Sequence, residues 1–167
     1  MLSFVIEYTI QHPNAEDGYG VNQLVAASPP LDTNSVYCNL LQCSHFADTS
    51  VIAKRGSTIL GFISGYRLPK DPETLFVWQV VVSAEARGQG LALKMLEAQV
   101  RSEACRGVRY MDTTITEDNG ASRALFAKFA KRQGAEMAER PFFEKDRHFD
   151  GRHESEYLIR IGPFSVS

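Results

Sequence analysis

A glycine-containing turn between an apolar run and a predicted helix holds the residues best suited to chemistry. It reads Arg87-Gly-Gln-Gly-Leu-Ala92 and follows residues 75–82, which are apolar on both faces except at Gln79. Backbone N–H groups at the start of a helix have no partner within the helix, and the helix dipole adds partial positive charge there. Gly88 and Gly90 let the backbone approach a ligand, and Arg87 adds a fixed charge. The turn therefore predicts a site for phosphate groups.

Two nucleotide-binding motifs fit this turn poorly. A Walker A loop needs Gly-Lys-Ser/Thr after four intervening residues, which the segment lacks. A Rossmann turn needs a third glycine where Lys94 stands. The plain structural alternative is a turn that uses glycine for its geometry alone, and the spacing Arg-Gly-x-Gly-x-Ala disfavours it.

The elements that must position this turn alternate along the chain. Helices are expected at residues 15–27, 35–46, 91–104 and 121–133, and strands at 50–54, 58–67, 75–82, 108–116 and 157–161. The order strand, helix, strand, helix from residue 75 to residue 133 implies a parallel strand pair with a crossover helix. The charge-rich residues 139–156 predict a solvated loop that leads into an edge strand. The pattern indicates an α/β fold in a single domain, residues 1–167.

Composition excludes several classes of protein. Lys and Arg number 18 against 20 Asp and Glu, a net charge of −2, so nucleic acid is not an expected partner. No apolar run approaches the length of a membrane span, and Met1 to Glu7 lack the features of a signal peptide, so we expect a cytoplasmic protein without a membrane partner. Cys38, Cys43 and Cys105 are interpreted as reduced thiols, and neither they nor the histidines have metal-ligand spacing.

A second motif follows the next predicted strand. It reads Asp118-Asn119-Gly-Ala-Ser122-Arg-Ala-Leu125-Phe126. Together, the two motifs resemble the acetyl-CoA signature and the Asn-x-x-(Ser/Ala)-x-x-Leu-(Tyr/Phe) segment of the GNAT superfamily of N-acetyltransferases. The resemblance implies a mixed, strongly twisted sheet with helices on both faces and central parallel strands that splay apart. It also implies acetyl-CoA as co-substrate, and no metal.

The resemblance assigns acetyl-CoA to three places. The central strand is expected to offer backbone N–H groups to the acetyl carbonyl and the pantetheine, the glycine turn to hold the phosphates, and the start of the second helix to flank the pantetheine arm. The residues so assigned are Val80, Val82, Arg87, Gly88, Gln89, Gly90, Leu91, Ala92, Asn119 and Ser122.

A narrower resemblance covers nearly the whole chain. The segments concerned are Ser28-Pro-Pro-Leu-Asp-Thr-Asn-Ser-Val-Tyr37, Cys43-Ser-His-Phe46, Gly65-Tyr-Arg67, Phe76-Val-Trp-Gln-Val80 and Arg160-Ile-Gly-Pro163. They are similar to the diaminobutyrate acetyltransferase family, which acetylates the 4-amino group of L-2,4-diaminobutyrate in the biosynthesis of ectoine, a compatible solute of osmotic stress. The resemblance suggests a homodimer, and Pro141-Phe-Phe143 offers apolar surface for a partner.

A small substrate with two ammonium groups needs carboxylates, aromatic rings and a donor for its own carboxylate. The candidates are Asp32, Tyr37, Trp78, His153 and Glu156, with Arg67 and Arg160 as other possible donors. Each has a plain structural alternative: core packing for Trp78, a surface aromatic for Tyr37 and a loop position for His153.

Proton transfer is the least determined step. An amine of pKa near 10 is only about 0.1% neutral at pH 7, so desolvation or a base must help. Glu156 is favoured as the proton acceptor, and Asp32, Asp112, Glu154 and release through water stay open. Many GNAT relatives place a Tyr that protonates the thiolate where this chain has Phe126, so that role is vacant, moved or left to water.

Two other functions stay open on the sequence. One is N-acetylation of another small amine such as lysine, ornithine or a polyamine. The other is a non-catalytic module that binds acyl-CoA. Thiol release that depends on added amine separates catalysis from binding.

Overall fold

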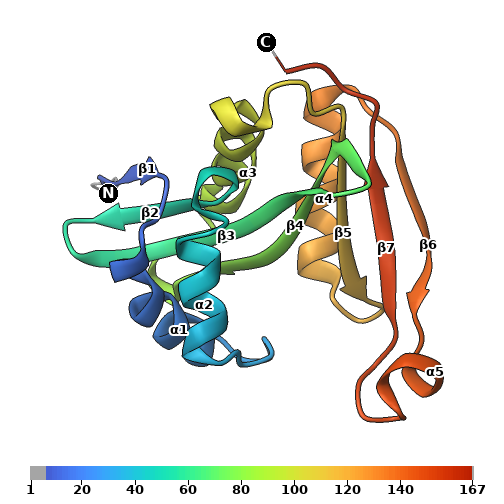
Figure 1. Ribbon diagram of the computed structural model, residues 1–167, viewed down its shortest axis with the longest axis horizontal. Helices are drawn as coiled ribbons and strands as arrows, with labels where there is room; N and C mark the ends of the chain where they lie inside the picture. Colours follow the sequence, from blue (N-terminus) through green and yellow to red (C-terminus); the bar gives the residue numbers. More distant parts are fainter. Residues whose placement is uncertain (1–6, 167) are drawn as a thin grey trace.

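The protein is built around a seven-stranded sheet (Figure 1). The computed structural model describes residues 7–166. Residues 1–6, where the absence of a signal peptide was predicted, lie outside the described part. The strands, in their order across the sheet, are β1 (Thr9–Gln11), β2 (Val51–Arg55), β3 (Thr58–Leu68), β4 (Asp71–Val82), β5 (Tyr110–Thr116), β7 (Glu156–Ile161) and β6 (Met137–Phe143). The helices are α1 (Gly18–Ala26), α2 (Val36–Cys43), α3 (Leu91–Arg101), α4 (Gly120–Gln133) and α5 (Lys145–Phe149).

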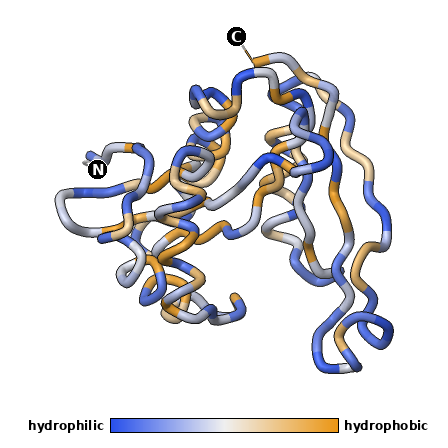
Figure 2. Tube along the Cα trace, viewed as in Figure 1, coloured by the Kyte–Doolittle hydropathy of each residue, from blue (hydrophilic) through white to orange (hydrophobic). Residues whose placement is uncertain are grey.

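Helices cover both faces of the sheet, as predicted. The larger core joins α3 and α4 to one face through side chains such as Leu96 and Phe129, both 0% exposed. On the other face, Val21 of α1 and Cys43 of α2 pack against Phe62 of β3. Figure 2 shows apolar segments along the central strands, whereas the projecting connection between β6 and β7 is mostly hydrophilic. The apolar cores thus lie at the centre of the sheet.

The only parallel pair among the described strands, β4 and β5, is short. Residues Thr74 to Val77 pair with Tyr110 to Thr113, and the Thr113 hydroxyl donates to the Val77 carbonyl at 3.0 Å. Beyond Val77, β4 stays paired with β3 and β5 stays paired with β7. The two ribbons diverge toward their carboxyl ends in Figure 1. The predicted splay is confirmed.

A bulge on β4, opposite β3, marks the point where β4 leaves its parallel neighbour. Ile63 pairs with Val80 and Gly65 with Val77, so Ser64 faces two residues of β4. The buried Ser64 hydroxyl accepts the Gln79 backbone N–H at 3.0 Å. A bulge of this kind bends a strand and re-aims its side chains.

Residues 139–156 contradict the predicted loop. They contain most of β6 and the short helix α5, and β6 occupies the edge of the sheet. The predicted edge strand, β7, is an inner strand paired with β5 and β6. Charged side chains suit β6 because most of its residues are exposed. The charge pattern therefore identified an edge and misplaced it by one strand.

Other boundaries differ by a few residues. β4 begins at Asp71 instead of residue 75, and α3 ends at Arg101 with a separate short turn after it. β1 was missed because three residues carry too little pattern to be recognised. The predicted hairpin turn lies between β2 and β3, and Gly134 ends α4 in the left-handed conformation, as predicted.

Candidate active site

Alternation along β4 shows where its free N–H groups point. The N–H groups of Gln79 and Ser83 donate toward β3, to Ser64 Oγ and to the Leu60 carbonyl. Because successive N–H groups of a strand point to opposite edges, those of Val80 and Val82 point toward β5. The pairing of β5 with β4 has already ended at Val77. The two predicted donors thus face the gap between the splayed strands.

The glycine turn precedes α3 without a side-chain cap. The N-cap residue is Gly90, which has no side chain that could cap the helix. The first turn of α3 also holds no acidic residue. The first bond within the helix runs from the Lys94 N–H to the Gly90 carbonyl at 3.2 Å. The preceding N–H groups, including those of Leu91 and Ala92, thus have no partner in the helix. This end of α3 fits a phosphate group.

Glycine is required in this turn by backbone geometry. Gly88 and Gly90 have φ of 75° and 76°, and a Cβ at either position would meet no atom within 4 Å. The reason is therefore the left-handed backbone rather than crowding within the chain. Arg87 Nε donates to the Val82 carbonyl at 3.2 Å, and Gln89 Nε2 to the Glu85 carbonyl at 3.2 Å. These bonds tie the turn to the end of β4.

The second motif begins α4. Asn119 Oδ1 accepts the Ser122 N–H at 3.1 Å, so this side chain caps the helix. Phe126, where relatives carry a Tyr, is 1% exposed in the core and has no proton to give. The structure therefore gives Asn119 a local capping role and leaves the thiolate-protonating role without a residue in this position.

Trp78 lies outside the core. It is 41% exposed and meets Phe46 and Tyr66 edge-on, with ring centroids 5.8 and 6.0 Å away. The core-packing alternative for Trp78 is wrong, because its side chain lies on an open aromatic surface with Phe46 and Tyr66. Tyr37, in the first turn of α2, is 69% exposed, which leaves its surface alternative standing.

Asp32 and His153 meet although they are 121 residues apart. His153 Nε2 lies 2.9 Å from Asp32 Oδ2, and Nδ1 lies 2.6 Å from the Glu154 carbonyl oxygen. Both neighbours are hydrogen-bond acceptors, and the doubly protonated ring can donate to both of them. The carbonyl of Glu154 first, and then Asp32, raise the pKa of His153. The Phe149 ring lies 4.7 Å from the imidazole ring. These two acceptors favour the protonated form of His153.

Glu156 begins β7 opposite Thr116, at the splayed end of β5. It is half-buried, and Oε2 is fully buried with no hydrogen-bond partner among residues 7–166. Burial raises the pKa of Glu156, while His153 and a hydrogen bond from Thr114 lower it and Asp32 raises it. A partly desolvated carboxylate with an unused oxygen is suited to accept a proton or to hold an ammonium group.

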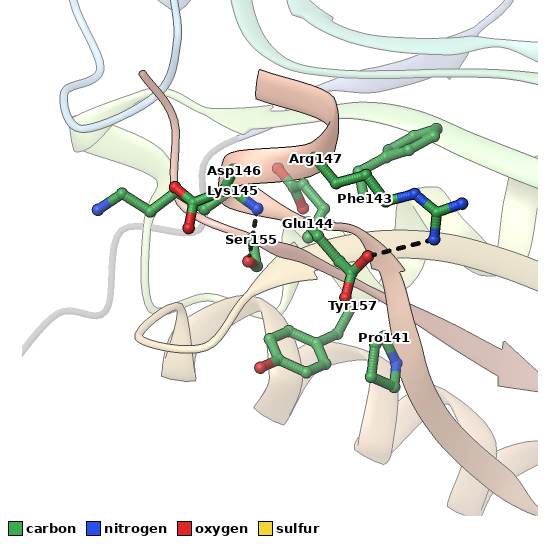
Figure 3. A pocket seen from close by; sticks show the side chains of 9 residues that line it. Pro141, Phe143, Glu144, Lys145, Asp146, Arg147, Ser155 and Tyr157 are labelled. Atoms are coloured by element: carbon green, nitrogen blue, oxygen red, sulfur yellow. Dashed lines mark hydrogen bonds and ion pairs between the residues drawn. The ribbon is translucent and has the colours of Figure 1, made fainter. Parts of the chain in front are cut away.

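A pocket of about 350 Å³ reaches Glu156 from the side of α5. Its lining consists of Pro141, Phe143, Glu144, Lys145, Asp146, Arg147, Ser155, Glu156 and Tyr157. Figure 3 shows several charged side chains among the lining residues, with the Lys145 N–H donating to Ser155 Oγ at 2.9 Å. Val80 and Val82 are not among the residues that line it.

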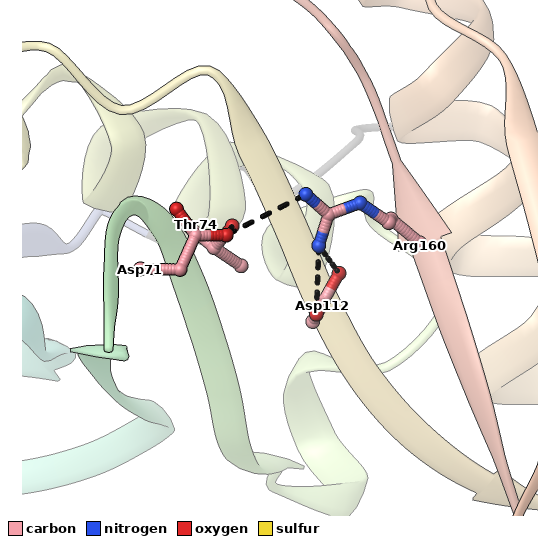
Figure 4. Close-up of polar contacts among 4 residues, drawn as sticks. All are labelled: Asp71, Thr74, Asp112 and Arg160. Atoms are coloured by element: carbon pink, nitrogen blue, oxygen red, sulfur yellow. Dashed lines mark hydrogen bonds and ion pairs between the residues drawn. The ribbon is translucent and has the colours of Figure 1, made fainter. Parts of the chain in front are cut away.

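The remaining charged candidates have other partners. Arg160 donates to both oxygens of Asp112 at 3.2 and 3.1 Å and lies 3.6 Å from Asp71 (Figure 4). Arg67 donates to backbone carbonyls, and Glu154 pairs with Lys145 at 2.8 Å. These pairs brace strands and loops, so Asp32, His153 and Glu156 are the charged group at the splay. Within residues 7–166, no cluster of His, Cys, Asp or Glu is placed to hold a metal ion.

Two splayed parallel strands beside an uncapped helix start define an acyl-CoA-dependent transferase site. Residues 20–130 match the acetyltransferase (GNAT) family, and the chain belongs to that family. Within it, the chain belongs with the L-2,4-diaminobutyric acid acetyltransferases. It is 49% identical over 158 residues to the enzyme of that name from Methylotuvimicrobium alcaliphilum, covering 95% of this chain and 92% of the relative. The relative from Bordetella parapertussis is 45% identical over 161 residues, 96% and 87% of the two chains.

A solved structure agrees with these relatives. Diaminobutyrate acetyltransferase EctA from Paenibacillus lautus, in complex with L-2,4-diaminobutyric acid and coenzyme A, is 40% identical. It aligns with a TM-score of 0.91 over 98% of this chain and 99% of that chain. The GNAT fold predicted from the two sequence motifs is confirmed.

Proposed function

We propose that this protein transfers the acetyl group of acetyl-CoA to the 4-amino group of L-2,4-diaminobutyrate, giving N4-acetyl-L-2,4-diaminobutyrate for ectoine biosynthesis. The observation that carries the proposal is the contact between Asp32 and His153, which joins the two sides of the splay. Asp32 belongs to the loop beside β4, and His153 precedes β7, the neighbour of β5. A pair of opposite charges thus connects the loop beside β4 with the segment that leads into β7. This placement suits a zwitterionic diamine.

The acetyl-CoA side uses backbone groups of the chain. The first turn of α3 and Arg87 bind phosphates, and Val82 donates to the pantetheine. The Val80 N–H faces the splay, where it stabilises negative charge on the acetyl oxygen as the amine attacks. Acetyl-CoA supplies the thioester that the amine cleaves. Asn119 and Ser122 flank the pantetheine arm through the start of α4.

The charged group orients the diamine. The His153 imidazolium pairs with the substrate carboxylate, while Asp32 and Glu156 attract its ammonium groups. Trp78 and Tyr37 offer aromatic faces to the cation. A substrate anchored by its α-amino and carboxyl groups near Asp32, Tyr37 and His153 presents its 4-amino group to the thioester. The proposed regiochemistry follows from this orientation.

Glu156 is the proposed proton acceptor. Its raised pKa brings it closer to that of the amine, and its unpartnered oxygen can receive the proton. Transfer of the proton to water competes with this route. Phe126 leaves the thiolate to be protonated from elsewhere, and solvent is the simplest source.

A homodimer and a cytoplasmic location complete the proposal. Phe143, on the edge strand β6, is 41% exposed and lies 4.3 Å from the Phe142 ring, which gives a partner an apolar contact. The three cysteines are free, and burial raises the pKa of Cys43 to about 12, so this thiol stays protonated. Light scattering at micromolar concentration that gives a monomeric mass would contradict the dimer. Among the described residues, no helix is long and apolar enough to cross a membrane.

A thiol-release assay tests the activity. Acetyl-CoA is mixed with the protein and then with diaminobutyrate, ornithine, lysine or a polyamine in turn. We expect free thiol to appear only after amine is added, and fastest with diaminobutyrate. Faster turnover of another amine would replace the substrate, and tight binding of CoA without turnover for any amine would make the protein a binding module.

A further inference from the structure

A chain of side-chain amides connects α1 and α2 to β4. Asn22 Nδ2 donates to the Asn34 carbonyl at 2.8 Å and to Asn39 Oδ1 at 3.0 Å, and Asn39 Nδ2 donates to Gln42 Oε1 at 2.9 Å. The chain reaches β4 where Asn34 Nδ2 donates to Gln79 Oε1 at 3.0 Å. Asn39 and Gln42 are 0% exposed. These bonds connect Asn34 to both helices and to β4, although the buried Nε2 of Gln42 has no hydrogen-bond partner among the described residues.

Asn34 fixes the loop that carries Asp32. Its carbonyl is held by Asn22 of α1 and its side chain by Gln79 of β4. The next residue, Ser35, caps α2 by accepting the Cys38 N–H at 3.1 Å. Asp32 lies two residues before Asn34, a reach of about 7 Å at most. The position of Asp32 relative to β4 therefore depends on Asn34.

Gln79 fixes the other end of the same link. It stands between the exposed Trp78 and Val80, whose N–H faces the splay. Its own N–H is held by the buried Ser64 at the bulge. The bond between Asn34 and Gln79 consequently joins the carboxylate that attracts the substrate to the strand that holds the acetyl oxygen. Neither residue belongs to the charged group itself.

We propose that Asn34 and Gln79 are positioning residues that set the length of diamine this enzyme accepts, an inference that rests on the proposed function. The diamine must reach from its anchor at Asp32 to the thioester at Val80, so the separation of those two points acts as a ruler. One methylene changes the rate constant kcat/KM by roughly 10- to 200-fold where a site is well fitted. This separation can discriminate between diamines of different length only if Asp32 and the Val80 N–H are both held in place.

The test compares substrates that differ by one methylene. The substitutions Asn34→Leu and Gln79→Met keep the approximate volume and remove the amide. We measure kcat/KM for 2,3-diaminopropionate, diaminobutyrate and ornithine. Each substitution should lower the preference for diaminobutyrate over ornithine by about 3- to 10-fold, the worth of one hydrogen bond. The double variant should lose no more than either single variant, because both remove the same bond.

Rescue separates positioning from general loss of stability. In Asn34→Asp the Gln79 amide can rotate and donate to the new carboxylate, so the preference should return toward the wild-type value. Arg106→Leu, which removes an exposed ion pair with Glu103 beyond the C-terminal end of α3, serves as the control for stability. The melting temperature and the KM for acetyl-CoA report whether each variant is folded. If Asn34→Leu fails to fold, Asn34→Ser replaces it.

Several results would overturn the ruler. One is a preference for diaminobutyrate over ornithine that stays within twofold of wild type in both single variants. Another is a double variant in which the two losses add. A third is an Asn34→Asp protein that behaves like Asn34→Leu. A wild-type enzyme that acetylates diaminobutyrate and ornithine equally well would also overturn it while leaving acetyl transfer intact. A wild-type protein that acetylates neither would instead contradict the proposed function.

Discussion

The two halves of the proposed site are built from different materials. On the acetyl-CoA side, the donors are backbone N–H groups at β4 and at the first turn of α3, all within residues 80–92. On the substrate side, Asp32, His153 and Glu156 bring side-chain charges from distant parts of the chain. Backbone donors keep their strength at any ordinary pH, whereas the charged side depends on protonation. The first half should respond to changes in backbone shape, and the second to changes in charge.

Removal of the charge at position 156 should have the largest effect. Glu156→Gln keeps the size of the side chain and abolishes the carboxylate. Loss of a general base typically lowers kcat by 10²–10⁴-fold. We expect the loss to shrink as pH rises from 7 to 9.5, because the amine then loses its proton unaided. Steady-state kinetics at saturating acetyl-CoA measure this.

Two other outcomes at position 156 have definite meanings. A rise in the KM for diaminobutyrate with kcat unchanged would make Glu156 a binding group only. If both constants stay within a factor of two of wild type, water carries the proton and Glu156 has no role. In either case Glu156 would not be the proton acceptor, and the substrate side of the site would have no general base among its charged residues.

A change of backbone shape should affect the other half alone. Gly90→Val places a β-branched residue at a φ of 76° beside the phosphate site. We expect the KM for acetyl-CoA to rise about 10- to 100-fold, the worth of a hydrogen bond to a charged group. The KM for diaminobutyrate should change little.

Gly56 provides the matched control. It has a φ of 60° in the turn between β2 and β3, and a Cβ there would also meet no atom within 4 Å. Gly56→Val therefore carries a similar backbone penalty away from the site. Equal effects of the two substitutions on the KM for acetyl-CoA would show that the glycine turn is not the phosphate site.

Neutralising His153 should raise the KM for diaminobutyrate about tenfold and change kcat little, because one charge-assisted contact to the substrate carboxylate is lost. The variant is His153→Gln. His12→Gln is the control, since His12 also meets a carbonyl, that of Ser50 at 2.8 Å, far from the splay. A KM that stays at the wild-type value would remove His153 from the substrate site.

The smallest expected effect is a pKa shift. Asp32 is one cause of the raised pKa of His153, and the Glu154 carbonyl is the larger one. Asp32→Asn should thus lower this pKa only part of the way toward its ordinary value near 6.5. The ion pair stabilises the fold fully below pH 6.5, and its contribution is lost as pH rises through the raised pKa of the folded protein. NMR titration of the His153 ring checks the shift, and an unchanged pKa would contradict the bridge.

The same contrast explains what the sequence could predict. The glycine turn and the helix after it are local features. The spacing of a few residues around Gly88 and Gly90 was therefore enough to predict both of them. Asp32 and His153 were both candidates through a family resemblance, but their contact spans 121 residues and only the fold brings them together. The inner position of β7 was missed for the same reason, because a strand's second neighbour leaves little trace in its own sequence.

A polar residue within an apolar run of sequence is a sign of a specific hydrogen bond in the fold. Gln79 is the one polar residue in the run 75–82, and it proved to be the point where the amide network meets β4. Asn22, Asn39 and Gln42 gave no comparable sign, since such residues are common on helix surfaces. The open position of Trp78 could not be predicted either, because it depends on which residues of other elements cover that face of the sheet.

The position of the new acetyl group tests the central claim most directly. Diaminobutyrate labelled with ¹⁵N at the 4-amino group is incubated with the protein and acetyl-CoA that carries ¹³C at its carbonyl. The account predicts a product whose labelled carbonyl is coupled to the labelled nitrogen in the NMR spectrum. A product acetylated mainly on the 2-amino group would contradict the placement of the substrate between Asp32, His153 and the Val80 donor.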